Sequence, residues 1–208
     1  MRLDHLVVGC TDLVQGEAWL AERLGVAASG GGEHLQYGTH NRLWRLDGHR
    51  YLELIACKPG ASAAQTPPFG LSQSAVQARL AERPRLLTWV ARVDPGDDVA
   101  RVWAACPGLA EPVAVQRGDF HWRLAIAEDS GLCDGGAVPH LIWWQPPHPT
   151  DVLPPLGLAL DALWLNTPER GRLAPIAALL TGEPVTVVDG PQGLVARIRT
   201  DQGRVELD

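Results

Sequence analysis

One order of strands and helices recurs along this chain and limits the folds that it can adopt. Residues 3–8 alternate as a strand does, residues 12–24 carry apolar side chains at helical spacing, and three short strand-like runs follow before residue 57. Residues 86–144 and 160–207 repeat this order of one strand, one helix and three strands. The recurrence predicts an α+β protein built from repeated βαβββ units.

The boundaries of these units follow from composition. We assign the first unit to residues 1–57, the second to residues 85–149 and the third to residues 150–208. Residues 58–84 are rich in Ala, Gln, Ser and Pro, and we interpret them as a connector with one helix. Prolines cluster in residues 145–155, a composition typical of a stiff, extended joint.

Two pairs of tetrapeptides support the third repeat. LDHL at residues 3–6 resembles LDAL at residues 160–163, and YLEL at residues 51–54 resembles RVEL at residues 204–207. These matches equate the first and last strands of the two units. An odd number of units leaves three arrangements open: the third is spare, is shared with a second chain in a homodimer, or packs on the first two.

Composition excludes several classes of protein. The chain has 208 residues and a formal net charge of −6, which leaves no general basic surface for nucleic acid. Its apolar runs are far shorter than the ~20 residues of a membrane-spanning helix, and its first residues lack a signal-peptide pattern, so we expect a cytoplasmic protein. The four cysteines are widely spaced, which predicts buried thiols. No phosphate-binding glycine loop is present, so we expect no nucleotide cofactor.

Two strand positions carry ionisable groups on faces otherwise suited to burial. His5 lies in the strand at residues 3–8 and Glu53 in the strand at residues 51–55. A buried imidazole or carboxylate is costly unless it is paired or bound to a metal. Two interpretations stay open: a satisfied core histidine with a salt-bridged glutamate, or one functional site formed by both.

Other polar and aromatic residues suit a small-molecule pocket. His140 is the only titratable group in its strand and is a candidate for a third metal ligand or an acid–base group. The aromatic run at residues 120–122 is expected in the core or at a dimer surface, and His148 lies in the proline-rich joint. The candidate substrate-binding residues are His34, Thr39, Asn41, Trp89 and Trp144, with ordinary core packing as the alternative for the tryptophans.

Four short motifs follow one another in the first unit. They are Leu3-Asp4-His5, Gly31-Gly32-Glu33-His34, Gly38-Thr39-His40-Asn41 and Tyr51-Leu52-Glu53. In this order they resemble the glyoxalase-like domain family of the vicinal oxygen chelate superfamily, which includes glyoxalase I and extradiol dioxygenases. The resemblance extends over about residues 3–150, and His140 departs from it because an aromatic residue is expected there.

This resemblance implies a fold and a chemistry. Two βαβββ units would form a curled mixed sheet around a pocket. A divalent metal (Zn, Ni, Mn or Fe) would be held by His5 and Glu53, with Glu53 and His140 as catalytic residues. The implied activity is that of a lyase, isomerase or dioxygenase on a small oxygenated metabolite. The alternative is a metal-free protein that binds or sequesters a small molecule.

Overall fold

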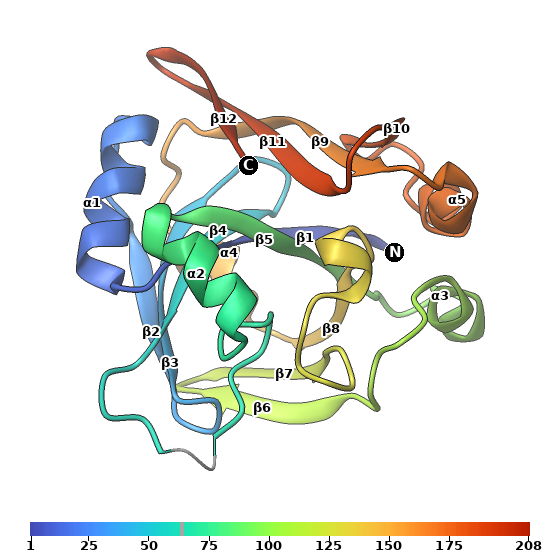
Figure 1. Cartoon of the computed structure of the whole chain (residues 1–208), viewed down its shortest axis with the longest axis horizontal. Coiled ribbons are helices and arrows are strands. Elements are labelled where there is room, and N and C mark those ends of the chain that lie inside the picture. The colour runs from blue at the N-terminus through green and yellow to red at the C-terminus, as the bar shows by residue number, and fades with distance from the viewer. Residues whose placement is uncertain (63–64) are drawn as a thin grey trace.

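Eight strands form one strongly curled sheet in the computed structural model, which describes residues 1–62 and 65–208 (Figure 1). The strand order is β2-β3-β4-β1-β5-β8-β7-β6. The strands are β1 (Arg2–Gly9), β2 (Gly30–His34), β3 (Thr39–Arg45), β4 (Tyr51–Cys57), β5 (Arg85–Arg92), β6 (Val113–Arg117), β7 (Phe120–Ala125) and β8 (His140–Gln145). β1 pairs in parallel with β4, β5 pairs in parallel with β8, and β1 and β5 meet antiparallel in the middle. The predicted α+β fold of repeated βαβββ units in a curled mixed sheet is confirmed.

Five α-helices and one 3-10 helix (Cys133–Gly136) accompany the strands of the described residues. The α-helices are α1 (Leu13–Leu24), α2 (Ser74–Glu82), α3 (Val99–Ala105), α4 (Pro149–Val152) and α5 (Arg170–Leu179). The side chain of Asp12 accepts a hydrogen bond from the Gln15 backbone N–H and so begins α1, and Gly25 ends it with a φ of 72°. None of the helices in the described ranges is long and apolar enough to cross a membrane.

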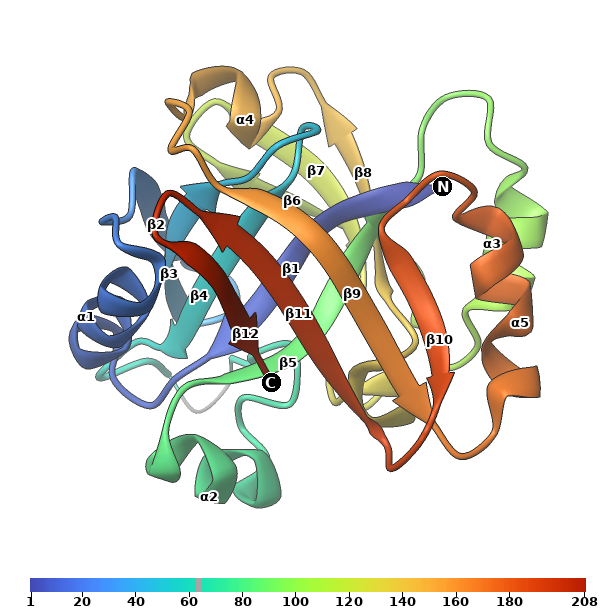
Figure 2. The same ribbon diagram turned by 90° about the horizontal axis from the view of Figure 1, so that it is seen from above.

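A second sheet of four strands covers the outer face of the first. Its order is β10-β9-β11-β12, and its strands are β9 (Ala159–Thr167), β10 (Val185–Asp189), β11 (Gly193–Thr200) and β12 (Gly203–Leu207). β9, β11 and β12 cross over β1 and β5 (Figure 2). Leu163 and Ile198 of this sheet belong to the same buried cluster as Leu6 and Trp89 of the first sheet. The third unit therefore packs on the first two, one of the three expected arrangements.

The third unit keeps the element order of the others but not their strand order. β1 and β4 are parallel neighbours, whereas β11 separates β9 from β12. The reason is that β10 returns after α5 to pair in parallel with one edge of β9, and β11 takes the other edge. The matching tetrapeptides at the ends of the two units therefore occupy strands with different neighbours.

Glycines begin the first hairpin of the sheet, because Gly30–His34 form β2 and the turn follows it. A Cβ on Gly31, whose φ is 152°, would lie 2.3 Å from the Asn41 carbonyl oxygen, so glycine permits this close strand pairing. The proline-rich joint is not simply extended, because it contains α4 and buries His148.

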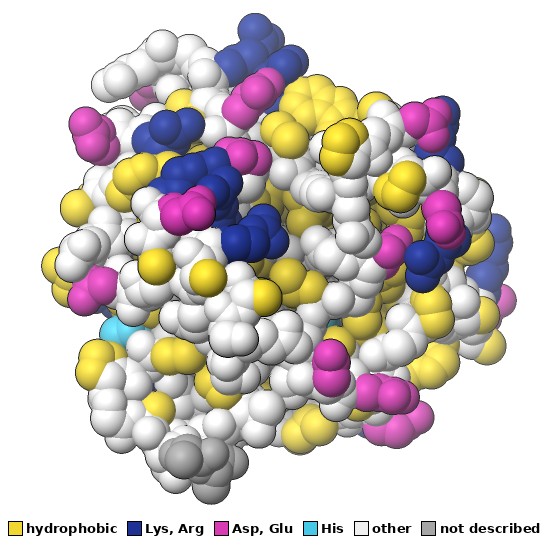
Figure 3. All heavy atoms as spheres, viewed as in Figure 1, with side chains coloured by type: hydrophobic (Ala, Val, Ile, Leu, Met, Phe, Trp, Pro, Cys, Tyr) yellow, Lys and Arg dark blue, Asp and Glu magenta, His cyan; other side chains and the backbone are white. Residues whose placement is uncertain are grey.

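The connector closes the concave side of the first sheet. Phe69 and Leu71 from this segment join a buried cluster with Val7, Ile55 and Trp122. Residues 63 and 64 of the predicted connector lie outside the described part of the chain. On the face seen in Figure 3, acidic and basic side chains are interspersed rather than gathered into a patch of one sign.

Candidate functional site

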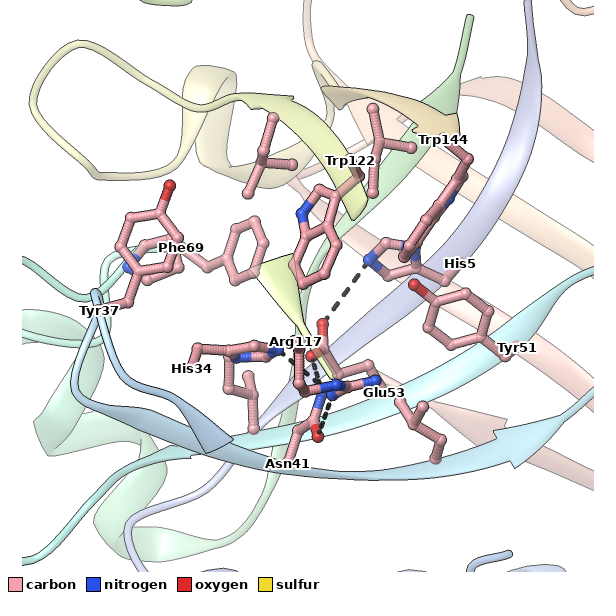
Figure 4. A pocket seen from close by; sticks show the side chains of 15 residues that line it. His5, His34, Tyr37, Asn41, Tyr51, Glu53, Phe69, Arg117, Trp122 and Trp144 are labelled. Atoms are coloured by element: carbon pink, nitrogen blue, oxygen red, sulfur yellow. Dashed lines mark hydrogen bonds and ion pairs between the residues drawn. The ribbon is translucent and has the colours of Figure 1, made fainter. Parts of the chain in front are cut away.

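A pocket opens on the concave side of the eight-stranded sheet (Figure 4). The space inside it, including its open mouth, is about 470 Å³. Strands of both units and the connector supply its walls. They include His5, His34, Tyr37, Asn41, Tyr51, Glu53, Phe69, Arg117, Trp122 and Trp144.

His5 lies between two carboxylates. Its Nδ1 atom is 2.7 Å from Oδ1 of Asp4, and its Nε2 atom is 3.6 Å from Oε2 of Glu53. The ring of Tyr51 stacks on the imidazole with 4.4 Å between centroids, which holds the plane of the ring. A register shift of β1 against β5 between Leu3 and His5 bulges the strand at Asp4. A β-bulge of this kind changes the direction of a side chain, which fits the contact between the side chains of the consecutive residues Asp4 and His5.

Asp4 is completely buried and receives several hydrogen bonds. His148 Nδ1 accepts the backbone N–H of Thr150, so His148 Nε2 carries the proton and donates it to Asp4 Oδ2 at 3.1 Å. The indole N–H of Trp144 donates to Asp4 Oδ1 at 3.3 Å. Burial would raise the pKa of Asp4, but the hydrogen bonds from His148 and His5 outweigh it and hold that pKa well below its ordinary value. Asp4 is therefore an anion, and His5 donates to it through Nδ1.

A chain of hydrogen bonds continues from Glu53 across the pocket. The Asn41 side-chain amide donates to Glu53 Oε1 at 2.6 Å. Arg117 Nη1 donates to Asn41 Oδ1 at 2.9 Å and lies 3.4 Å from His34 Nε2. Because a guanidinium only donates, His34 Nε2 is an acceptor and its Nδ1–H points to Thr39 Oγ1 at 3.1 Å. Burial, and then the charge of Arg117, lower the pKa of His34 to about 4.

Several sequence-predicted residues meet in this pocket and others do not. His5, Glu53, His34, Asn41 and Trp144 line it together. Thr39 is buried behind His34 rather than at the wall. Trp89 lies in the core between the two sheets, where its indole N–H donates to the Ala137 carbonyl at 3.1 Å.

His140 is fully buried beside the pocket rather than in its wall. Its ring meets the edge of Phe69, a pocket residue, with 4.9 Å between centroids. Neither ring nitrogen has a hydrogen-bond partner among the described residues. Burial, and then the nearby His5, lower the pKa of His140 to about 3, so the imidazole is neutral near pH 7.

The donors present do not complete a metal centre. Asp4 orients the His5 ring as a carboxylate does in many histidine–metal sites, and Glu53 offers a second ligand. In the described ranges no group of three or more His, Cys, Asp and Glu residues could hold a metal ion. The next polar group, the Asn41 amide, turns a donor rather than an acceptor towards Glu53. Catalytic metal sites ordinarily have three protein ligands.

Several residues of the site had no predicted role. They are Asp4, Tyr51, Phe69, Arg117, Trp122 and His148. Asp4 and Tyr51 stand within the motifs that drew attention to His5 and Glu53, and that position was the available signal. Arg117 and His148 come from distant segments, and only the folded chain brings them to the site.

The paired βαβββ units and the pocket between them define a protein of the vicinal oxygen chelate superfamily. Within it, the chain belongs to the glyoxalase-like domain family, whose sequence pattern it matches over residues 3–181. No curated protein matches the sequence.

Two solved structures with a similar fold are epimerases. The methylmalonyl-CoA epimerase from Mycobacterium tuberculosis is 18% identical over 70% of this chain and 88% of its own, with a TM-score of 0.45. A variant of the Streptomyces coelicolor methylmalonyl-CoA epimerase, in complex with 2-nitronate-propionyl-CoA, is 16% identical over 69% of this chain and 96% of its own, with a TM-score of 0.46.

Proposed function

We propose that this chain binds a small oxygenated metabolite in the pocket and moves a proton next to its carbonyl group, which is the reaction of an isomerase. The observation that carries the proposal is the position of His5 between buried Asp4 and pocket-facing Glu53. Among the activities that the family resemblance implies, an isomerase needs only two groups that exchange protons with the substrate.

Each group has one task. The Glu53 carboxylate removes the proton from the carbon beside the carbonyl group. His5, protonated on both nitrogens, donates from Nε2 to the carbonyl oxygen, where negative charge develops. The Asp4 anion stabilises the imidazolium and keeps its orientation. Glu53 then returns a proton on the same face to that carbon or to the neighbouring carbon, while His5 takes a proton back from the enol, which leaves both side chains as they began.

The surroundings of Glu53 and His5 support these separate roles. Glu53 and His5 are 5% and 3% exposed, so their charges act in a largely water-free environment. Asn41 holds one oxygen of Glu53 and leaves the other directed towards His5. His140 takes no part in the proposed step because it does not line the pocket.

Divalent-metal chelation by His5 and Glu53 is a second candidate, favoured by the contact of Asp4 with the far side of the His5 ring. With two protein donors, such a centre would depend on oxygen atoms of the substrate. Metal analysis of protein purified without a histidine tag separates the candidates. Bound Zn, Ni, Mn or Fe, with activity that a chelator abolishes and the metal restores, would replace the metal-free proposal.

Deuterium exchange tests the proposal directly. We would incubate the protein in D₂O with a panel of small oxo acids, hydroxy ketones and aldehydes and follow the loss of C–H signals by NMR. The Glu53→Gln variant should slow the exchange of an active compound by about 10²-fold or more, the usual contribution of a positioned base. Glu22→Gln, at an exposed position of α1, is the matched control.

Two outcomes would contradict proton transfer. One is exchange that is unchanged in Glu53→Gln. The other is a panel in which compounds bind, as read from tryptophan fluorescence, but none exchanges. The second outcome would favour the metal-free binding protein.

A further inference from the structure

Arg117 reaches into the pocket across the seam where the curled sheet almost closes. β2 and β6 are the two edge strands of the eight-stranded sheet, and Arg117 ends β6. Its side chain lies over Gly32 of β2, where a Cβ atom would be 3.0 Å from Arg117 Cδ. The missing side chain at residue 32 leaves the room in which Arg117 crosses to Asn41 and His34 (Figure 4).

The charge of Arg117 is not neutralised by the described residues. Several half-buried arginines elsewhere have carboxylate partners, such as Glu183 for Arg50 at 2.8 Å and Asp4 for Arg92 at 3.7 Å, whereas Arg45 donates to the Leu153 carbonyl. Arg117 has no such ion pair within the described ranges. Its guanidinium lies 5.7 Å from the centre of the Phe120 ring, and its polar contacts there use only Nη1. The Nε and Nη2 donors are left for another acceptor.

The groups around Arg117 do not supply that acceptor. Asn41 turns its oxygen to Nη1 and its amide to Glu53, so both ends of this side chain are occupied. Glu53 is held by Asn41 and faces His5 with its other oxygen. The lowered pKa of His34 leaves it neutral near pH 7. A ligand therefore has to bring the negative charge.

We propose that Arg117, positioned by Asn41 and His34, binds a carboxylate group of the substrate, so that the substrate is a small organic acid with a flat apolar body. A guanidinium matches a planar carboxylate through two parallel hydrogen bonds. Trp122 and Trp144 lie in the same pocket with 5.1 Å between ring centroids and provide an apolar wall for that body. This inference rests on the proposed function in one respect only: the carbon atom that loses its proton is placed near Glu53.

Matched acids and neutral analogues test this subsite by calorimetry. The pairs are phenylpyruvate with its methyl ester, phenylacetate with phenylacetamide, and benzoate with benzamide. Each acid that binds should bind at least 10-fold more tightly than its neutral partner. Arg117→Gln should abolish this preference and Arg117→Lys should keep part of it. Arg123→Gln, on β7 with its guanidinium near the Pro112 carbonyl, is the matched control.

The outcomes separate this inference from the proposed reaction. The carboxylate subsite is overturned if none of the acids binds, if neutral partners bind equally well, or if the preference survives Arg117→Gln. Tighter binding of phenyl phosphate than of the carboxylates would reassign the subsite to phosphate groups. The Glu53→Gln variant should still prefer acids. The subsite can therefore be confirmed even if the protein catalyses no proton exchange.

Discussion

Asp4 Oδ2 accepts a hydrogen bond from His148 Nε2 at 3.1 Å, although the two residues are 144 positions apart in the sequence. His148 belongs to the joint between the second and third units, and it also caps α4. The joint therefore does more than connect units, because it supplies a donor to the buried carboxylate that orients His5. The ring of His148 also lies 5.3 Å from that of Trp144, centroid to centroid, which places the joint against the pocket wall.

Replacing His148 should weaken the proposed reaction more than it weakens binding. In His148→Ala, Asp4 loses one donor and holds the His5 imidazolium less firmly, so deuterium exchange should slow by about 10- to 100-fold, as for other residues that orient a catalytic histidine. Binding of phenylpyruvate should change less than the rate. His49→Ala removes another histidine that contacts Thr150 and is the control. Equal losses in both variants would contradict a specific role of His148.

Two neighbouring glycines should respond differently to substitution because they serve different purposes. The three atoms nearest to a Cβ at Gly32 all belong to the flexible side chain of Arg117, so Gly32→Val should displace Arg117 and weaken acid binding with little effect on the free energy of unfolding. A side chain at Gly31 would collide with the Asn41 backbone and adopt an unfavourable φ, so Gly31→Ala should lower the free energy of unfolding by about 1–3 kcal/mol. Urea unfolding and calorimetry measure both effects. Normal acid binding by Gly32→Val would argue against the crossing position of Arg117.

The local part of the fold could be predicted from the sequence because its determinants are local. The Asp12 cap and Gly25 set the ends of α1 through hydrogen bonding and backbone conformation of the residues themselves. The strand order of the third unit could not be predicted, since it depends on which edge of β9 receives β10. The similar tetrapeptides share neither strand neighbours nor burial, because residues 51–54 are all buried whereas only Leu207 of residues 204–207 is buried.

The residues of the site also divide into those that could be predicted from the sequence and those that could not. His5 and Glu53 were recognisable as polar residues in strands suited to burial, whereas Arg117 becomes part of the pocket only because the sheet curls until β6 approaches β2. Trp122 was expected in the core or at a dimer surface; it lies in a buried cluster and also lines the pocket, for the same reason. Curvature of this kind arises from the whole sheet and is not encoded in any one segment.

Acidification should destabilise the protein through His140. The pKa of His140 is lowered to about 3 in the folded chain, against 6.5 ordinarily, because burial disfavours its charged form. Between these pH values the unfolded chain binds more protons, so the free energy of unfolding falls as the pH decreases. His140→Leu should reduce the stability difference between pH 7 and pH 5 by up to about 2 kcal/mol, as measured by urea unfolding. His121→Gln, at an exposed position, should keep the wild-type difference. An unchanged pH dependence in His140→Leu would contradict a buried neutral imidazole.

Trp89 and Trp144 were both predicted from the sequence as candidate substrate-binding residues, but their substitutions should have different effects. Trp89 is fully buried between the sheets and donates to the Ala137 carbonyl, so Trp89→Phe loses a hydrogen bond and leaves a cavity. We expect a decrease of about 2–4 kcal/mol in the free energy of unfolding with ligand affinity unchanged in the folded protein. Trp144 borders the pocket and donates to Asp4, so Trp144→Phe should weaken binding of phenylpyruvate and cost less stability. Urea unfolding and calorimetry on the two variants measure these effects, and Trp89→Phe that weakened binding without loss of stability would place Trp89 in the binding site instead of the core.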